Sequence, residues 1–549
     1  MDNIDNIENR FGFLHGGERA AYLLRGLYEA HGYKKYRMGK FEEYDFYTGY
    51  KDFLPSGQIL TFTDLNGKLM ALKPDVTMSI IKRTRAAPGN PERLYYNESI
   101  YRPARGSREF KEIEQIGVEY IGGVGADVSL EIISLALESL ALINADFILD
   151  VSHNGFLSGL LESAALPPEA GRDLARLLEQ KNAHEIGCLL DKYEAGSEIK
   201  DRLQRLLSIT GDFGEGLREA GDLVTNVKMD AALTELNVLY AAFAGSPAAG
   251  ALRLDFSSFA GNASYYNGLV MRGYTYGAAR PVLSGGRYDP LLRRLGVREL
   301  EAIGFAVYLD EIDAGVRTPR TAVYDIAGSS ANDTASGTEC ADHLTIALPK
   351  GRMGNMAYEL FTAAGYGCDG YSEDSRKLVI NNDAAGVSFL LVKPQDVAVY
   401  VERGAADLGI AGKDTLLETS PDIYELLDLR FGKCRLAVAA PDAYEDDPDA
   451  VLRVATKYPN VTRDYFTRQN REIEVIKLNG SIELAPVLGI SDVIADIVET
   501  GTTLKENNLS VRELIADSSA RLIANIISYK FKLPEISSLL EKIITRLSN

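Results

Sequence analysis

The segment Ser491–Leu509 reads SDVIADIVETGTTLKENNL, and this pattern decides the fold of its half of the chain. The run IADIV at 494–498 predicts a buried strand. A turn of small, hydroxyl-bearing residues with one glycine follows at Glu499–Thr503. Thr503–Glu506 then has the S/T-x-x-E spacing of a capping box, which predicts that a helix begins there.

A strand, a short Gly/Thr loop and a helix N-terminus together favour phosphate binding, because backbone N–H groups converge and the helix dipole attracts an anion. The two carboxylates beside the loop can accept hydrogen bonds from sugar hydroxyls or hold a magnesium ion. The predicted binding residues are Asp496, Glu499, Thr500, Gly501, Thr502 and Thr503. On the loop alone, an ordinary capped helix after a strand is an equal alternative.

The loop resembles the phosphoribosyl-diphosphate (PRPP) loop of ATP phosphoribosyltransferase, the first enzyme of histidine biosynthesis, and the resemblance runs across His343–Asn549. Its other blocks are LTIALPKGRM at 344–353, DSRKL at 374–378, DLGIAGKDTL at 407–416, FGKCRLAVA at 431–439, RVATKYPNVTRDYF at 453–466, LNGSIELAPVLG at 478–489 and DSSARLI at 517–523. The resemblance implies attack of N1 of ATP on C1 of PRPP with loss of pyrophosphate, and Mg²⁺ accompanying both substrates.

Strand and helix patterns alternate in this half, which predicts an α/β fold with mostly parallel sheets. The family implies two such lobes around a cleft, as in a type II periplasmic binding protein. We expect lobe one to hold about 343–437 plus the C-terminal segment, and lobe two about 440–520.

Three cations are the predicted catalytic residues. Lys350 and Arg352 follow the first strand at its C-terminal end, where ligands lie in open α/β sheets. Arg376 belongs to the DSRKL block. We expect Arg352 and Arg376 to contact pyrophosphate or ATP phosphates, because charge on the leaving group and positioning dominate such a transfer. A purely solubilising surface role is the alternative. Weaker candidates for ligand contact are Lys413, Lys457 and Glu483.

The composition of the whole chain restricts its class. With 549 residues it is too long for one core, so at least two domains are expected. A net charge of −19 disfavours a nucleic-acid binder. No apolar run is long enough to cross a bilayer, and the N-terminus MDNIDNIENRFG is unlike a signal peptide. The cysteines form no CxxC pair, so we expect reduced thiols and a cytoplasmic location.

The first half shows a different order of patterns. A helical pattern at 20–31 ends at Gly32, and strands at 59–63 and 68–72 are joined by Asn66-Gly67, which favours a two-residue hairpin turn. Further expected elements are two strands within 94–121, a helix at 127–143, mostly helix over 157–245, strands at 251–259, 264–274 and 280–285, and a strand and helix over 302–314.

This half resembles the catalytic core of histidyl-tRNA synthetase over roughly residues 9–314. The matching segments are FEEYDFY at 41–47, KPDVT at 73–77, the loop 102–115 with QIGVE at 115–119, SYYNGLV at 264–270, PVLSGGRYDPLL at 281–292 and AIGFAVYLDEI at 302–312. The resemblance implies an α+β, class II synthetase-like domain with an antiparallel sheet surrounded by helices.

Departures from that family indicate lost adenylation. The family reads RGLDYYTG where GNASYYNG stands, so Gly261 replaces the arginine that holds the histidine carboxylate and Ser264 replaces the aspartate. Glu311 stands where an arginine is expected to hold ATP phosphate, and its charge repels a triphosphate. No anticodon-binding domain follows residue 314, so tRNA is not an expected partner.

The pocket for histidine itself is retained in this resemblance. One carboxylate neutralises the ammonium, and a second acidic group with a tyrosine hydroxyl pairs with the imidazole. The implied histidine-binding residues are Asp75, Thr77, Gln115, Glu119, Tyr265 and Tyr266. The alternative is that these side chains only satisfy one another inside the sheet. The domain resembles the regulatory subunit that accompanies short-form ATP phosphoribosyltransferase.

We therefore predict three parts: a regulatory domain at 1–315, a flexible linker at 316–342 and a catalytic domain at 343–549. The linker is small and polar, and it fixes a 1:1 ratio of the two domains. Histidine is the expected feedback effector, which requires different affinities for two states. By analogy with the hetero-octamer of separate subunits, a homotetramer is expected. The rival functions are a histidine-activating or tRNA-charging enzyme and a non-catalytic ligand-binding sensor.

Overall fold

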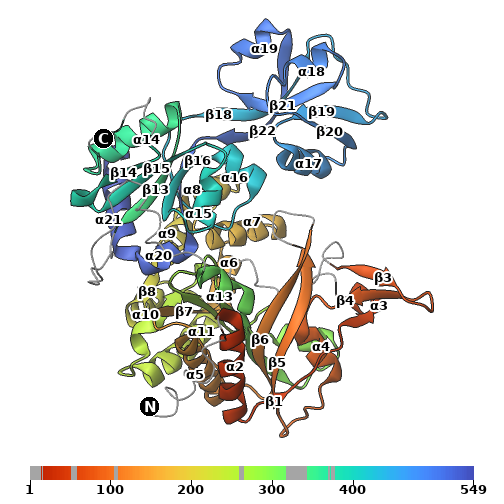
Figure 1. Cartoon of the computed structure of the whole chain (residues 1–549), viewed down its shortest axis with the longest axis vertical. Coiled ribbons are helices and arrows are strands. Elements are labelled where there is room, and N and C mark those ends of the chain that lie inside the picture. Colours follow the sequence, from red (N-terminus) through yellow and green to blue (C-terminus); the bar gives the residue numbers. More distant parts are fainter. Residues whose placement is uncertain are drawn as a thin grey trace. The chain divides into compact units, whose positions relative to one another are not determined.

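The computed structural model describes residues 14, 16–50, 59–103, 109–258, 265–316, 343–368, 371 and 377–548 (Figure 1). The chain divides into two compact units, Met1–Gly337 and Thr338–Asn549, each with its own sheets. The division falls within the predicted linker at 316–342, of which residues 317–342 lie outside the described residues.

The N-terminal unit is built on a nine-stranded sheet in the order β1-β5-β6-β12-β11-β10-β7-β9-β8. Its strands are β1 (Lys34–Lys35), β5 (Glu92–Pro103), β6 (Phe110–Gly122), β7 (Phe147–His153), β8 (Thr210–Asp212), β9 (Leu252–Asp255), β10 (Leu269–Thr275), β11 (Leu283–Arg287) and β12 (Glu301–Tyr308). Among these described strands, β1–β5 and β7–β9 pair in parallel, and the other pairs are antiparallel. The predicted antiparallel, synthetase-like sheet is confirmed.

Helices surround this sheet. They are α2 (Gly16–Ala30), α3 (Asp45–Thr48), α4 (Val76–Arg83), α5 (Ala126–Ile143), α6 (Asn154–Ser163), α7 (Pro168–Glu179), α8 (Ala183–Lys192), α9 (Ser197–Ser208), α10 (Phe213–Gly221), α11 (Val227–Phe243), the 3₁₀ helix η2 (Ala249–Ala251), α12 (Asp289–Arg294) and α13 (Leu309–Val316). The apolar helix α5 contacts strands β7, β10 and β12. Tyr28, Ile132 and Phe305 are at most 2% exposed in the resulting core, because their large apolar surfaces leave water on folding.

A small three-stranded sheet, β2-β4-β3, leads to one predicted site segment, KPDVT. Its strands are β2 (Phe41–Glu43), β3 (Thr61–Thr63) and β4 (Leu69–Leu72). The predicted two-residue Asn-Gly turn is wrong, since Thr63 pairs with Leu69 and a longer loop joins the strands. The Asp64 carboxylate accepts hydrogen bonds from the backbone of Asn66 and Lys68, which stabilises the longer loop.

The C-terminal unit has two lobes, each with its own sheet (Figure 1). Lobe one has the order β14-β15-β13-β16-β23-β17, and lobe two has β20-β19-β21-β18-β22. The lobe-one strands are β13 (Leu344–Pro349), β14 (Val379–Asn382), β15 (Val387–Val392), β16 (Leu408–Gly412), β17 (Tyr424–Asp428) and β23 (Ala520–Ala524). The lobe-two strands are β18 (Cys434–Pro441), β19 (Leu452–Thr456), β20 (Ile473–Lys477), β21 (Val493–Val498) and β22 (Leu509–Ser518).

Both lobe sheets are mixed, so the prediction of mostly parallel sheets is wrong. The pairs β13–β15, β13–β16, β19–β20 and β19–β21 are parallel. Antiparallel pairs arise where the chain returns between the lobes, as in β18–β21, β18–β22, β16–β23 and β17–β23. The lobes still have the predicted two-lobed α/β architecture.

Helices complete each lobe. Lobe one carries α14 (Arg352–Ala363), the 3₁₀ helix η6 (Asp383–Ala385), α15 (Val397–Glu402), α16 (Lys413–Thr419), α20 (Ile526–Phe531) and α21 (Leu533–Ser548). Lobe two carries α17 (Pro459–Arg468), α18 (Leu484–Val487) and α19 (Thr502–Glu506). No helix among the described residues is long and apolar enough to span a membrane.

The chain crosses between the lobes twice. One crossing joins β17 to β18 and the other joins β22 to β23. The two crossings are paired, since the Leu429 N–H donates to the Ala520 carbonyl and the Ala520 N–H donates to the Phe431 carbonyl, both at 2.9 Å. These paired crossings connect lobe one to lobe two.

Candidate functional site

The predicted PRPP loop joins β21 to α19 at the carboxyl end of β21 in lobe two. Its neighbour β19 is parallel to β21, so Lys457, directly after β19, lies at the same edge of the sheet. Gly501 has a positive φ of 75°, which glycine adopts without the steric cost of a Cβ. The hydroxyls of Thr500 and Thr502 lie 3.1 Å apart within hydrogen-bond distance.

The predicted capping box at Thr503–Glu506 is wrong. Helix α19 begins at Thr502, its N-cap is Gly501, and no side chain caps it. Thr503 already has helical backbone geometry there, so it does not occupy the extended N-cap conformation that the box requires. The cap residue therefore provides no side-chain acceptor for the backbone N–H groups at this helix start.

Asp496 points out of β21 beside this loop and has a perturbed acidity. Burial raises its pKa to about 6, and the nearby Glu483 and Asp414 add to the effect while Lys457 opposes it. A carboxylate in that environment is stabilised by any incoming cation or hydrogen-bond donor. The predicted sugar-binding carboxylate thus has the electrostatics of a ligand site.

In lobe one, Lys350 and Arg352 follow β13. Gly351 has a φ of 98°, and α14 begins at Arg352. A Cβ on Gly354 would lie 1.7 Å from the Pro349 carbonyl oxygen, so only glycine lets this helix approach the strand end so closely. The close approach fixes the start of α14 and with it the position of Arg352, its first residue.

One contact joins the two predicted motifs directly. The Arg352 guanidinium donates to Glu499 Oε1 at 2.5 Å, although the two residues are 147 positions apart. The side chains are 71% and 49% exposed, so solvent and ligands can reach both. The structure therefore brings KGRM of lobe one and ETGTT of lobe two together.

Two further predicted residues of this half, Arg376 and Lys413, are respectively outside the described residues and buried in an ion pair. Arg376 lies outside the described residues, as do Gly261 and Ser264. Lys413 is buried and donates to Glu425 Oε2 at 2.7 Å, so its ammonium is part of the lobe-one interior. A contact between Lys413 and a phosphate stays a prediction.

The predicted histidine-binding residues gather in the N-terminal unit. Glu119 on β6 accepts a hydrogen bond from the Thr77 hydroxyl at 2.8 Å, and Glu119 and Gln115 are both buried. The rings of Tyr265 and Tyr266 meet edge to face at 4.8 Å. A Cβ on Gly304 of β12 would lie 2.0 Å from a Glu119 oxygen, so the glycine makes room for this carboxyl.

Two contributors to this pocket were missed at the sequence level. The Tyr288 hydroxyl donates to Glu119 Oε2 at 2.5 Å. Arg102 Nη2 donates to Asp75 Oδ2 at 2.9 Å, while Asp75 also caps α4 by accepting from the Met78 N–H. Tyr288 stands in the SGGRYDP segment and Arg102 in the basic loop, but only the fold shows which acid each one meets.

The carboxyl of Glu119 is buried, and that of Asp75 is 13% exposed. Burial raises the pKa of Glu119 to about 8, although the Tyr288 and Thr77 hydrogen bonds oppose the shift. Burial also raises the pKa of Asp75, against the lowering effect of Arg102. Buried acids whose pKa values are raised in this way are stabilised when a cationic ligand group enters.

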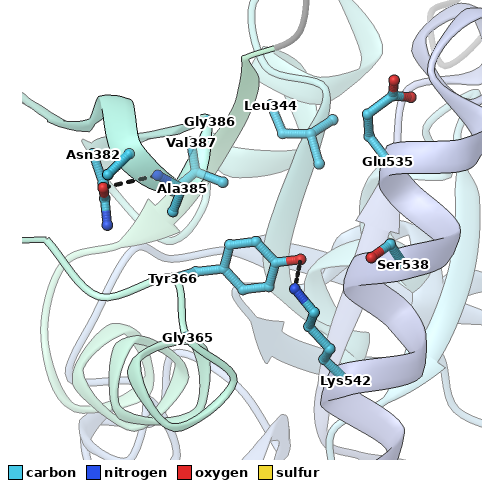
Figure 2. A pocket seen from close by; sticks show the side chains of 11 residues that line it. Leu344, Gly365, Tyr366, Asn382, Ala385, Gly386, Val387, Glu535, Ser538 and Lys542 are labelled. Carbon is cyan, nitrogen blue, oxygen red and sulfur yellow. Dashed lines mark hydrogen bonds between the residues drawn. The ribbon is translucent and has the colours of Figure 1, made fainter.

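A separate hollow of about 510 Å³ lies elsewhere in lobe one (Figure 2). It lies between the η6 turn and α21, and Lys542 donates to the Tyr366 hydroxyl at 3.2 Å in it. Leu344, the first residue of β13, lines the hollow, whereas Lys350 follows the last residue of that strand. The hollow is therefore at the opposite end of β13 from Lys350 and contains none of the predicted site residues.

Two family models match the chain. The model of ATP phosphoribosyltransferase matches residues 393–549, and the model of histidyl-tRNA synthetase matches residues 17–312. The second match spans more than half of the chain, and the first covers the C-terminal end, including the predicted PRPP loop.

Curated relatives cover the C-terminal half. The ATP phosphoribosyltransferase of Brachyspira hyodysenteriae is 56% identical over 201 residues, which are 36% of this chain and 98% of the relative. The enzyme of the same name from Clostridioides difficile is 50% identical over 202 residues, covering 36% of this chain and 96% of the relative. The chain thus contains almost the full length of each relative.

Solved structures give weaker likenesses. The ATP phosphoribosyl transferase (HisG:HisZ) complex from Thermotoga maritima matches with 34% identity and a TM-score of 0.34, covering 37% of this chain and 97% of that chain. An ATP phosphoribosyltransferase regulatory subunit/histidyl-tRNA synthetase from Bacillus halodurans C matches with 24% identity and a TM-score of 0.49, covering 69% of this chain and 94% of that chain. The assignment rests instead on the family models and the curated relatives. The chain belongs to the ATP phosphoribosyltransferase family, and it joins that catalytic half to an N-terminal half of the histidyl-tRNA synthetase family in one polypeptide.

Proposed function

We propose that the ATP phosphoribosyltransferase reaction takes place in the cleft between the two lobes and is inhibited by histidine bound in the N-terminal unit. The single observation that carries the catalytic site is the Arg352–Glu499 hydrogen bond across the cleft. It joins the cation-bearing strand end of lobe one to the glycine-containing loop of lobe two. Lobe one thus supplies cations for the pyrophosphate or ATP phosphates, and lobe two supplies the loop for the ribose phosphate of PRPP.

PRPP is assigned to the lobe-two side. The hydroxyls of Thr500, Thr502 and Thr503, with the backbone N–H groups around Gly501, donate to the ribose phosphate. Asp496 and Glu499 accept from the ribose hydroxyls. In the reaction the N1 lone pair of ATP forms the bond to C1, and the bond from C1 to pyrophosphate breaks with its electrons leaving on the oxygen.

The lobe-one cations act on the departing charge. Lys350, Arg352 and Arg376 are assigned to contact the pyrophosphate, which gains negative charge as the C1–O bond lengthens, or the ATP phosphates. Arg352 exchanges its Glu499 partner for the substrate phosphates when they enter. No protein nucleophile is required, because positioning and charge stabilisation account for the catalysis.

Magnesium fits this site as a companion of the substrates. Within the part of the chain that the structure describes, no three His, Cys, Asp or Glu side chains are grouped to hold a metal. Mg²⁺ commonly binds through one or two carboxylates together with substrate phosphates and water. Asp496, whose pKa is raised to about 6, and the exposed Glu499 are the residues that would hold it, and it would supply positive charge to the phosphates.

Histidine is assigned to the pocket of Asp75, Thr77, Gln115, Glu119 and the paired tyrosines 265 and 266. One carboxyl would neutralise the histidine ammonium, and the second, with a tyrosine hydroxyl, would pair with the imidazole. Inhibition follows when histidine binds more tightly to a less active state of the assembly. Arg102 already pairs with Asp75, and Glu311 stands in place of a phosphate-binding arginine, so tRNA charging is not favoured.

Histidine inhibition is expected to strengthen as the pH rises from about 7 to about 8. Glu119, with its pKa near 8, is largely protonated at the lower pH, and a cationic ligand binds better to the ionised form. Free histidine keeps its ammonium and has a mostly neutral imidazole in this window. The apparent inhibition constant should fall by up to about tenfold per pH unit, and Glu119→Gln should flatten the profile. A flat wild-type profile would contradict this role of Glu119.

Gly501→Ala is expected to raise the KM for PRPP about fivefold. The added Cβ meets Val498 Cγ1 at 3.8 Å, an ordinary contact, so the cost is the left-handed backbone conformation, about 1 kcal/mol. Steady-state kinetics with varied PRPP measures the change. Gly171→Ala, at an open position on α7, is the matched control and should leave KM unaltered. An unaltered KM in the Gly501 variant would remove this loop from PRPP binding.

The decisive test is turnover of ATP with PRPP and Mg²⁺, followed as phosphoribosyl-ATP formation with and without histidine. Product that decreases on adding histidine supports both parts of the proposal. Product that histidine does not affect supports the cleft and rejects the effector pocket. Absence of product favours a ligand-binding sensor.

The assembly is proposed to be a homotetramer, by analogy with assemblies of separate catalytic and regulatory subunits. A light-scattering mass of four times the 60.0 kDa chain mass is expected. A monomeric mass would reject the analogy.

A further inference from the structure

The helix α17 of lobe two is capped by a residue of lobe one. Its own N-cap residue, Tyr458, provides no side-chain cap. The Asn460 N–H instead donates to both carboxylate oxygens of Glu418, at 3.0 and 3.1 Å, and the Val461 N–H donates to Oε2 at 3.1 Å. Glu418 lies on α16, which follows the lobe-one strand β16. Open amides at a helix start are thus satisfied across the lobes.

The same pair of helices makes two more contacts between the lobes. The Asn460 side-chain amide donates to the backbone carbonyl of Glu418 at 3.1 Å. One turn earlier on α16, Asp414 Oδ2 accepts from the Tyr458 hydroxyl at 2.9 Å, and both residues are less than 10% exposed. Asp414 Oδ1 also accepts from the hydroxyl of Ser518, the last residue of β22 before the crossing.

Burial of the Glu418 carboxylate costs free energy, which its hydrogen bonds to the amides offset. Burial raises the pKa of Glu418, while the Asn460 and Val461 amides lower it, as do Lys477 and Arg463 nearby. A half-buried carboxylate is retained at such a place when its hydrogen bonds replace those to water. The residue therefore has a definite geometric role at the junction of the two lobes.

The latch, defined as Glu418, Asp414 and Tyr458, lies beside the crossings, whereas the Arg352–Glu499 contact joins two exposed side chains that follow β13 and β21. A contact near a hinge sets the angle between the parts that the hinge joins. We propose that the latch fixes the angle at which the lobe-one cations face the PRPP loop, so that its members are positioning residues for the transfer. This inference rests on the proposed assignment of the cleft as the catalytic site.

Loosening the latch should lower the fraction of enzyme with the lobes at the productive angle. The apparent affinity for a ligand that contacts both lobes falls by that fraction. Saturating substrate restores the angle, so kcat changes little. Glu418→Ala is therefore expected to raise the KM for PRPP about tenfold while kcat stays within about threefold of wild type.

Three matched variants complete the kinetic test in the full chain. Glu418→Gln keeps one acceptor oxygen and should recover most of the lost affinity. Tyr458→Phe removes only the hydroxyl and should raise KM about threefold, and it replaces Glu418→Ala if that variant does not fold. Glu541→Ala, on an exposed turn of α21, is the control and should not alter either constant. An unchanged KM in both latch variants, or a loss confined to kcat, would overturn the proposal.

Hydrogen exchange separates this inference from the assignment of the cleft, because it needs no turnover. The segment 458–468 of wild type should exchange slowly at Asn460 and Val461, and Glu418→Ala should accelerate it at least about tenfold. Segments of α14 and α20 should keep their rates. Faster exchange with unchanged KM would show that the latch forms but does not position the cleft, which overturns the proposal. Unchanged exchange in Glu418→Ala would reject the latch itself.

Discussion

Replacing Arg352 by alanine is expected to lower kcat for phosphoribosyl transfer by about 10²–10³, or about 2.7–4 kcal/mol of transition-state stabilisation. The guanidinium is exposed and contacts Glu499 of the proposed PRPP loop, so in the proposed site it faces the place where pyrophosphate would leave. Its interaction strengthens as the leaving group gains charge, and loss of that interaction lowers kcat more than it raises KM. Steady-state kinetics with ATP and PRPP varied in turn measures both constants.

Two companion variants make the Arg352 experiment specific. Arg352→Lys keeps the charge but loses the planar, two-pronged geometry, so it should recover only part of the rate. Arg403→Ala removes an arginine at the end of α15 and should leave kcat within about twofold. If Arg352→Ala turned over at the wild-type rate, the residue would have only the solubilising surface role.

The paired substitution Asp75→Asn with Glu119→Gln is expected to weaken histidine inhibition by at least about 100-fold. Both changes preserve shape but remove the two carboxyls that the ligand ammonium and imidazole are proposed to meet. Hydrogen bonds to charged groups contribute about 1.5–3 kcal/mol each, and a loss of about 2.7 kcal/mol corresponds to 100-fold. The measurement is the histidine concentration that halves turnover, at a fixed pH near 8.

The basal reaction should survive this double substitution, since neither residue belongs to the catalytic half. Glu215→Gln, an isosteric change on α10 outside the pocket, is the matched control and should retain full inhibition. Inhibition that persists in a folded double variant would place the effector site elsewhere. Loss of basal turnover would show that the pocket supports the fold of the active assembly.

Local patterns in the sequence predicted the elements around the site but not all of their details. The apolar run of β21 and the hydroxyl-rich residues with one glycine after it were sufficient to predict a strand followed by a turn. The capping box failed because α19 starts one residue before Thr503, with Gly501 as its cap. Capping signals describe a helix in isolation, whereas this helix start is set by the turn that leaves β21.

Such local patterns could not predict contacts between residues that are distant in the sequence. The Arg352–Glu499 bond joins residues 147 positions apart, and Tyr288 meets Glu119 across 169 positions. Lys413 had a place in a motif, but its ammonium is committed to Glu425 inside lobe one. A sequence shows which charges a segment carries, and the fold decides which of them remain available to a ligand.

The two crossings between the lobes have a consequence for how the chain acquires its structure. Lobe two, from β18 to β22, is a continuous segment, and its sheet is complete as soon as β22 has been synthesised. In lobe one, β16 and β17 lie on either side of β23 and do not pair with each other. The edge of each strand that faces β23 therefore stays unpaired until Ala520–Ala524 leaves the ribosome. Pairings between such distant segments form slowly, because a long loop must close before they gain any stabilisation. Completion of the lobe-one sheet therefore depends on β23. A nascent chain that stops before β23 exposes two unpaired strand edges, which are sites of aggregation.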